Sequence, residues 1–152
     1  MKILIYGAGV IGSLYAAYLH KAGYSVSLLA RGARLIDLKE NGLRYYVRGD
    51  IQHTDINVID NLWENDRYAY IFLTVREEQL RPALEQLRRN TSPTIVTMTN
   101  TIKPYNELEE LCGKGRLLPA FPGAGGGFRD GILDAGFTPF IIQPTTFGEI
   151  NG

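Results

Sequence analysis

Three glycines near the start of the chain have the spacing of a phosphate-binding turn. Gly7, Gly9 and Gly12 come directly after the aliphatic run 3–6, and a helical pattern follows them up to Gly23. In a strand, turn and helix of this kind, Gly7 permits the tight turn, Gly9 lets a pyrophosphate approach the backbone, and Gly12 allows close helix packing. The amides of the first helical turn then favour a bound phosphate, so the spacing predicts a dinucleotide site, with an ordinary structural turn as the alternative. The predicted contacts come from Gly7, Ala8, Gly9, Val10, Ile11 and Gly12.

Two arginines stand where a dinucleotide-binding protein selects its cofactor. The segment 24–30 predicts a second strand, parallel to the first because a helix joins them. A protein selective for NAD usually has Asp or Glu at the end of this strand, about twenty residues past the glycines. This chain has Arg31 and Arg34 there, and its first acidic residue is Asp37. Since guanidinium groups match a 2′-phosphate, these arginines predict NADPH as the cofactor, with a solvated helix start as the alternative.

Further polar residues follow the later strands, and ligands of an open parallel sheet bind beyond the carboxyl ends of its strands. Thr74 and Arg76 flank Val75 after the strand 68–74, and we expect them to contact the ribose or the phosphates of the cofactor. Asn100 is expected to hold the nicotinamide ribose or a polar group of the substrate, or else to be a turn residue.

A glycine-rich run, 122–127, follows a predicted strand at 116–121. Its backbone amides, that of Gly127 included, are expected to reach the nicotinamide; a flexible loop is the alternative.

The elements that position these residues alternate between strands and helices, which predicts a doubly wound α/β fold. We expect a single NAD(P)-binding Rossmann domain over residues 1–152, with about six parallel strands. A hairpin is predicted at 43–47 and 51–58, and a terminal hairpin at 131–135 and 137–143. Strands are expected at 3–6, 24–30, 68–74, 93–98 and 116–121, and helices at 13–20, 35–39, 75–89 and 104–111.

The composition excludes several classes of protein. The 152 residues include 16 basic and 16 acidic side chains, which gives no indication of binding to nucleic acid or to an anionic membrane. Cys112 is the only cysteine, so neither an internal disulfide nor a cysteine-rich metal site is possible, and we expect no metal. No stretch approaches the ~20 apolar residues of a membrane span. Because the first strand begins next to Met1, no signal peptide is expected and a cytoplasmic location is predicted.

Taken together, these motifs resemble the N-terminal domain of ketopantoate reductases (2-dehydropantoate 2-reductases). The likeness rests on the glycine turn 7–12, Arg31, the segment 73–79, Asn100 and the segment 129–131. It implies NADPH-dependent reduction of a 2-keto acid, ketopantoate to pantoate, on the route to pantothenate and coenzyme A. It also implies that Arg31 binds the 2′-phosphate, that Asn100 binds the nicotinamide side and the substrate, and that Gln79 lies in the cleft and contacts the substrate.

The chain departs from the family pattern at two points. The family usually has lysine where this chain has Arg76, which keeps the charge but changes the reach and the donor geometry, so the substrate can be another 2-keto acid. The family also places its general-acid lysine in a helical C-terminal domain that has no counterpart in these 152 residues. We therefore expect a cofactor-binding domain with little or no turnover, and a homodimer formed through an exposed apolar patch.

Two other readings remain. The first glycine turn is shared with the cofactor domains of other two-domain dehydrogenases, such as those acting on hydroxyisobutyrate, 6-phosphogluconate or glycerol phosphate. A lone Rossmann domain can also be a nucleotide-sensing module. The short-chain dehydrogenases are excluded, because none of the nine tyrosines has a lysine four residues later.

Overall fold

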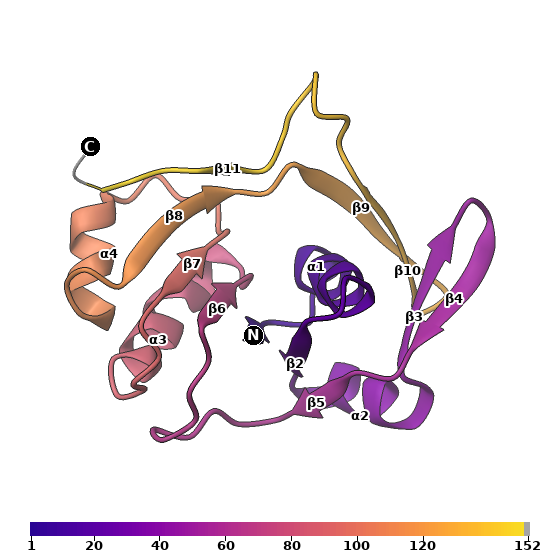
Figure 1. The fold of residues 1–152 in the computed structure, drawn as a ribbon, viewed down its shortest axis with the longest axis horizontal. Helices are drawn as coiled ribbons and strands as arrows, with labels where there is room; N and C mark the ends of the chain where they lie inside the picture. Colours follow the sequence, from indigo (N-terminus) through magenta and orange to yellow (C-terminus); the bar gives the residue numbers. More distant parts are fainter. Residues whose placement is uncertain (151–152) are drawn as a thin grey trace.

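A seven-stranded sheet with β1 near its centre organises the molecule (Figure 1). The computed structural model describes residues 1–150. Neighbouring strands run in the order β11-β8-β7-β6-β1-β2-β5, and all pairs are parallel except β11 with β8. The predicted Rossmann-type sheet of about six parallel strands is therefore confirmed. Its strands are β1 (Lys2–Tyr6), β2 (Ser25–Leu29), β5 (Asn57–Ile59), β6 (Tyr70–Leu73), β7 (Ile95–Thr97), β8 (Leu117–Phe121) and β11 (Thr146–Phe147).

Side chains of β1 alternate between two hydrophobic cores, as the two-residue period of a strand requires. Ile3 and Ile5 pack on one face of the sheet with helix α1 (Val10–Lys21). Leu4 and Tyr6 pack on the other face with α3 (Glu77–Leu87) and α4 (Tyr105–Cys112). Both faces of the strand are covered, which explains why its sequence is almost continuously apolar.

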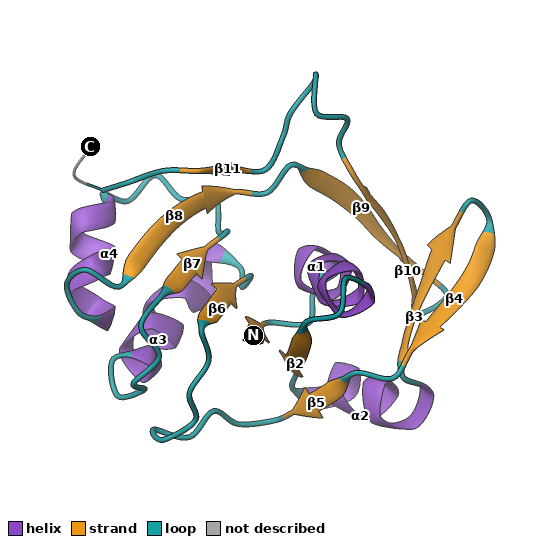
Figure 2. Ribbon diagram, in the orientation of Figure 1, coloured by secondary structure: helices purple, strands orange, loops and turns teal. Residues whose placement is uncertain are grey.

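A second, four-stranded sheet covers the outer side of α1 (Figures 1 and 2). Helix α2 (Gly32–Asn41) follows β2 in the chain, precedes β3 of this second sheet and packs against β5. Residues 12–17 of α1 are buried, because the helix is enclosed between the two sheets. The order of the second sheet is β4-β3-β10-β9, formed by β3 (Leu43–Val47), β4 (Asp50–Thr54), β9 (Ala124–Arg129) and β10 (Ile132–Phe137).

The predicted strand at 51–58 is wrong in one respect, because the chain changes sheets within it. The hairpin of β3 with β4 forms as expected, around Arg48 and Gly49 with φ of 52° and 92°. After Thr54 the chain leaves this hairpin, and β5 pairs with β2 in the main sheet. The side-chain amide of Asn57 donates a hydrogen bond of 2.8 Å to the hydroxyl of Ser27, which links β5 to β2.

The predicted terminal hairpin exists, but it lies earlier in the chain than expected. Strands β9 and β10 form it, so 137–143 is not its second strand and the glycine-rich run 122–127 is largely strand rather than loop. Its two-residue turn is Asp130-Gly131, with φ of 51° and 75°. Asp-Gly favours this type of turn because both residues tolerate positive φ, and that signal locates the hairpin correctly.

Exposed apolar side chains gather between β10 and β11. Phe140, Ile141 and Ile142 have exposed fractions of 83%, 96% and 74%. Such a patch is typical of a surface that associates with protein, although the homodimer itself stays a prediction. Among the described residues, no helix is long and apolar enough to cross a membrane, and no group of three His, Cys, Asp or Glu side chains has the arrangement of a metal site.

Candidate functional site

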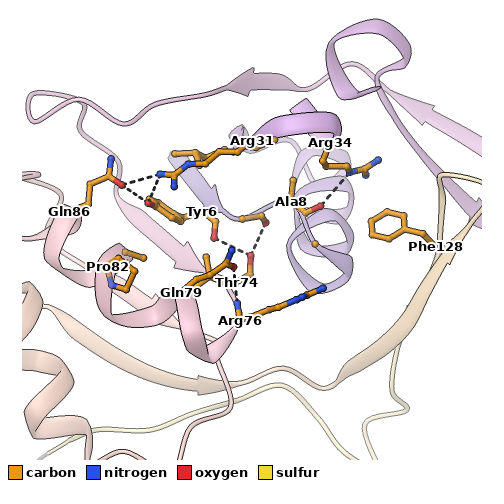
Figure 3. Close-up of a pocket in the computed structure, with 16 residues that line it drawn as sticks. Tyr6, Ala8, Arg31, Arg34, Thr74, Arg76, Gln79, Pro82, Gln86 and Phe128 are labelled. Atoms are coloured by element: carbon orange, nitrogen blue, oxygen red, sulfur yellow. Dashed lines mark hydrogen bonds between the residues drawn. The ribbon is translucent and has the colours of Figure 1, made fainter. Parts of the chain in front are cut away.

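A pocket of about 610 Å³ opens at the carboxyl ends of β1, β2 and β6 (Figure 3). This is the point where the chain reverses its direction of travel across the sheet, since β2 lies on one side of β1 and β6 on the other. Ligands of open α/β sheets bind at such a point. The pocket is lined by Tyr6, Gly7, Ala8, Gly9, Leu29, Ala30, Arg31, Arg34, Thr74, Val75, Arg76, Gln79, Pro82, Ala83, Gln86 and Phe128.

The glycine turn forms the wall of the pocket between β1 and α1. Gly7 has a φ of +115°, a conformation that side chains rarely adopt, and its N–H donates to the carbonyl of Leu29 at 3.2 Å. The hydroxyl of Thr74 lies 2.9 Å from the carbonyl oxygen of Gly7 and donates a hydrogen bond to it. Thr74 therefore fixes the turn from the neighbouring strand, in addition to lining the pocket.

Arg34 braces the same turn from α2. Its guanidinium donates to the carbonyl of Ala8 and to the hydroxyl of Ser13, both at 3.3 Å. It also forms an ion pair of 2.6 Å with Asp37, which in turn receives a hydrogen bond from Arg44. Burial lowers the pKa of Arg34, while Asp37 raises it. All three nitrogens of the Arg34 guanidinium thus donate hydrogen bonds to other groups of the protein.

Phe128 closes one side of the pocket from β9. Its ring centroid lies 4.6 Å from the guanidinium carbon of Arg34, within the range of a cation–π contact. Figure 3 shows the pair at the opposite side of the glycine turn from Arg31. The second sheet therefore contributes a wall to a site formed mainly by the first.

Arg31 extends over the opposite side of the pocket, toward α3. Its Nη2 donates to the hydroxyl of Tyr6 at 3.1 Å and to Oε1 of Gln86 at 3.3 Å. The Tyr6 hydroxyl donates in turn to the same oxygen of Gln86 at 2.5 Å. Burial raises the pKa of Tyr6, and the charge of Arg31 lowers it. The three side chains form one network at the edge of the pocket (Figure 3).

Arg76 and Gln79 lie where β6 leads into α3. The backbone N–H of Arg76 donates to Oε1 of Gln79 at 3.4 Å, which caps the first turn of the helix. The Arg76 side chain is 84% exposed and lies 4.0 Å from Glu78. Its charge is therefore available at the mouth of the pocket.

The structure brings nine of the residues predicted for the site into one pocket: Gly7, Ala8, Gly9, Arg31, Arg34, Thr74, Val75, Arg76 and Gln79. Val10 and Ile11 begin α1, and Gly12 packs beneath the turn, so these three lie behind the lining. Asn100 is exposed in the loop after β7, and Gly127 lies in β9 next to Phe128. Their roles at the nicotinamide stay predictions.

Tyr6, Gln86 and Phe128 line the pocket without having been expected there. The sequence did carry a signal for Tyr6. This residue comes directly before Gly7, and the alternation of side chains along β1 places it on the face of the sheet that α3 covers. Gln86 and Phe128 carry no local signal of this kind. Their place depends on how α3 and β9 pack against the main sheet.

A family model described as ketopantoate reductase PanE/ApbA matches residues 3–150 of the chain. The chain belongs to the ketopantoate reductase family. The resemblance drawn from the glycine turn, Arg31 and the segment 73–79 is thereby confirmed. This membership agrees with the Rossmann-type sheet described above.

Individual ketopantoate reductases agree with this membership. A 2-dehydropantoate 2-reductase of Mesorhizobium japonicum is 35% identical over 105 residues, which cover 67% of this chain and 32% of that protein. The crystal structure of a 2-dehydropantoate 2-reductase from Geobacter metallireducens superposes with a TM-score of 0.81 at 18% identity, over 99% of this chain and 50% of that one. The chain thus spans about a third of the first relative and half of the second.

A D-mandelate dehydrogenase, solved as a ternary structure with NADH and anilino(oxo)acetate, has the same fold. Its TM-score is 0.75 at 22% identity, and the match covers 91% of this chain and 46% of that one. The likeness to these ketopantoate reductases and to the mandelate enzyme shows a shared Rossmann-type α/β fold.

Proposed function

We propose that this chain binds NADPH in the pocket at the ends of β1, β2 and β6, and presents it for the reduction of a 2-keto acid such as 2-dehydropantoate. The observation that carries the proposal is the meeting of the glycine turn with Arg31, Arg34 and Arg76 in a single pocket. Among residues 1–150, the lining includes three guanidinium groups and no carboxylate. Such a pocket favours a ligand with several phosphate charges.

The residues present fit a nicotinamide dinucleotide. Apart from Gly9 and the residues next to it in the chain, no atom of the described residues lies within 4 Å of the position that a Cβ on Gly9 would take, so a pyrophosphate has room to approach the backbone there. We assign the pyrophosphate to the turn 7–9 and the start of α1, the 2′-phosphate to Arg31, and further charge neutralisation to Arg76. Bound in this pocket, NADPH supplies the hydride for a keto-acid reduction.

Such a reduction also needs a proton. The lining formed by the described residues contains neither lysine nor histidine, and the proton of its one tyrosine hydroxyl, that of Tyr6, is engaged in a hydrogen bond to Gln86. The chain's own residues therefore bind and orient the cofactor, and we propose that residues 1–152 alone turn over a 2-keto acid slowly or not at all.

Arg31→Ala tests the cofactor assignment. We expect the unmodified protein to bind NADPH about tenfold more tightly than NADH, a difference of about 1.4 kcal/mol, and Arg31→Ala to abolish that preference because the 2′-phosphate loses its guanidinium partner. Fluorescence titrations with both nucleotides measure this ratio. Arg81→Ala is the matched control, since Arg81 is exposed on α3, pairs with Glu85 and does not line the pocket. Equal affinity for both nucleotides before the substitution would contradict the assignment of NADPH.

Arg34→Ala is expected to behave differently from Arg31→Ala. Because Arg34 holds the carbonyl of Ala8 and anchors the turn to α2, its loss should weaken NADPH and NADH by the same factor, about fivefold. The same titrations provide the measurement. Weakening of NADPH alone would instead assign Arg34 to the 2′-phosphate.

A further inference from the structure

We propose that Tyr6 and Gln86 are positioning residues that hold the Arg31 guanidinium ready to receive a 2′-phosphate, and so help to determine the choice between NADPH and NADH. The inference deepens the proposed function and rests on it. It is carried by the closed network of hydrogen bonds among these three side chains at the edge of the pocket (Figure 3).

The direction of each hydrogen bond in this network is fixed by chemistry. A guanidinium can only donate, so the Tyr6 hydroxyl accepts from Arg31 and gives its single proton to Oε1 of Gln86. That oxygen also accepts from Arg31, which leaves each group with a compatible partner. The Tyr6 hydroxyl is protonated at neutral pH, as tyrosine ordinarily is, and burial raises its pKa further.

The network uses only one end of the guanidinium. Nη2 of Arg31 makes both hydrogen bonds, and among residues 1–150 neither Nε nor Nη1 has a protein partner. These two nitrogens remain for an oxyanion. The Tyr6 ring also lies below the guanidinium, with 6.0 Å between the ring centroid and the guanidinium carbon.

These hydrogen bonds have an energetic consequence, because a free arginine side chain loses rotamer entropy when it is immobilised. Tyr6 is only 4% exposed and is fixed in the core between β1 and α3, so it offers Arg31 a rigid partner. Ordering Arg31 before the nucleotide arrives reduces the cost of binding. The lower cost of binding favours NADPH, which carries the 2′-phosphate, and does not apply to NADH.

The amide of Gln86 also suits this task better than a carboxylate would. A carboxylate at this position would form an ion pair with Arg31 and repel the incoming phosphate. The neutral amide orients the guanidinium while leaving its charge uncompensated. The charge of Arg31 is then available to the ligand.

The test compares the affinities of NADPH and NADH for Tyr6→Phe and Gln86→Glu. Tyr6→Phe removes the hydroxyl but keeps the ring. We expect it to lower the affinity for NADPH about fivefold and to leave the affinity for NADH unchanged. Gln86→Glu should weaken NADPH by more, about tenfold or above. In an Arg31→Ala background, Tyr6→Phe should have no further effect on either nucleotide, because its partner is gone.

Tyr15→Phe is the matched control. The Tyr15 hydroxyl hydrogen-bonds to Thr145 and the residue does not line the pocket, so its loss should leave the ratio of affinities unchanged. Equal weakening of NADPH and NADH by Tyr6→Phe would show a general structural role and overturn the inference. Retention of the full preference in both variants, while Arg31→Ala abolishes it, would overturn this inference and leave the proposed function intact. Failure of the unmodified protein to bind either nucleotide would overturn the proposed function and this inference with it.

Discussion

Gly12→Ala is expected to lower the free energy of unfolding by about 2–3 kcal/mol. A Cβ at Gly12 would overlap the carbonyl oxygen of Gly7, and it would lie 2.5 Å from the hydroxyl oxygen of Thr74. The first of these atoms belongs to the backbone of the turn and the second locks the turn to β6, so neither can move without distorting the site. Urea denaturation of the unmodified protein and of Gly12→Ala, followed by circular dichroism, measures this change in the free energy of unfolding.

The matched control for this prediction is Gly136→Ala. Gly136 lies in β10, outside the pocket, and a Cβ there would meet no atom of residues 1–150 within 4 Å apart from its neighbours in the chain. We expect it to change the free energy of unfolding by less than about 0.5 kcal/mol. Unchanged stability in Gly12→Ala would contradict the close packing of α1 beneath the turn.

Gly9→Ala is expected to weaken both NADPH and NADH about 100-fold, while the free energy of unfolding falls by less than about 1 kcal/mol. The Cβ would project into open space beside the turn, where no other part of the described chain lies within 4 Å, so the unliganded protein can accommodate it. A pyrophosphate that approaches the backbone of Gly9 needs the same space. Titration with each nucleotide, together with thermal denaturation, separates the two effects.

The comparison of these glycines also separates ligand binding from folding. If Gly9→Ala left both affinities unchanged, the turn would not hold the pyrophosphate and the assignment of the pocket would be wrong. Parallel losses of stability in Gly9→Ala and Gly12→Ala would show instead that both glycines serve the fold. Loss of nucleotide affinity in Gly9→Ala together with loss of stability in Gly12→Ala would assign Gly9 to ligand binding and Gly12 to the packing of α1.

Much of the main sheet could be predicted because its signals are local. A strand, a glycine turn and a helix that follow one another within about 20 residues are visible as a period of two, a run of glycines and a helical pattern. Residues at the ends of parallel strands then meet by topology alone, and the pocket accordingly contains Gly9, Arg31, Thr74 and Arg76.

The second sheet was harder to predict because its strands come from separate parts of the chain. Strand β3 pairs with β10 through Tyr45 and Leu133, which are far apart in sequence. Such pairing leaves no local pattern. The hairpin of β9 with β10 is local by contrast, and the turn at Asp130-Gly131 carried a usable signal for it, but the predictions placed the terminal hairpin too late and did not assign the glycine-rich run 122–127 to a strand.

The sequence by itself determined the family, the Rossmann-type sheet and the positions of the glycine turn and its arginines, because each depends on residues close together in the chain. Only the tertiary structure decided how the arginines divide their contacts. Arg31 and Arg34 are three residues apart, yet one contacts Tyr6 and Gln86 while the other contacts Ala8 and Ser13. Those partners come from β1, α3, the turn and α1, and the hydrogen bonds form only when the packing of these elements brings donors and acceptors within about 3 Å of one another.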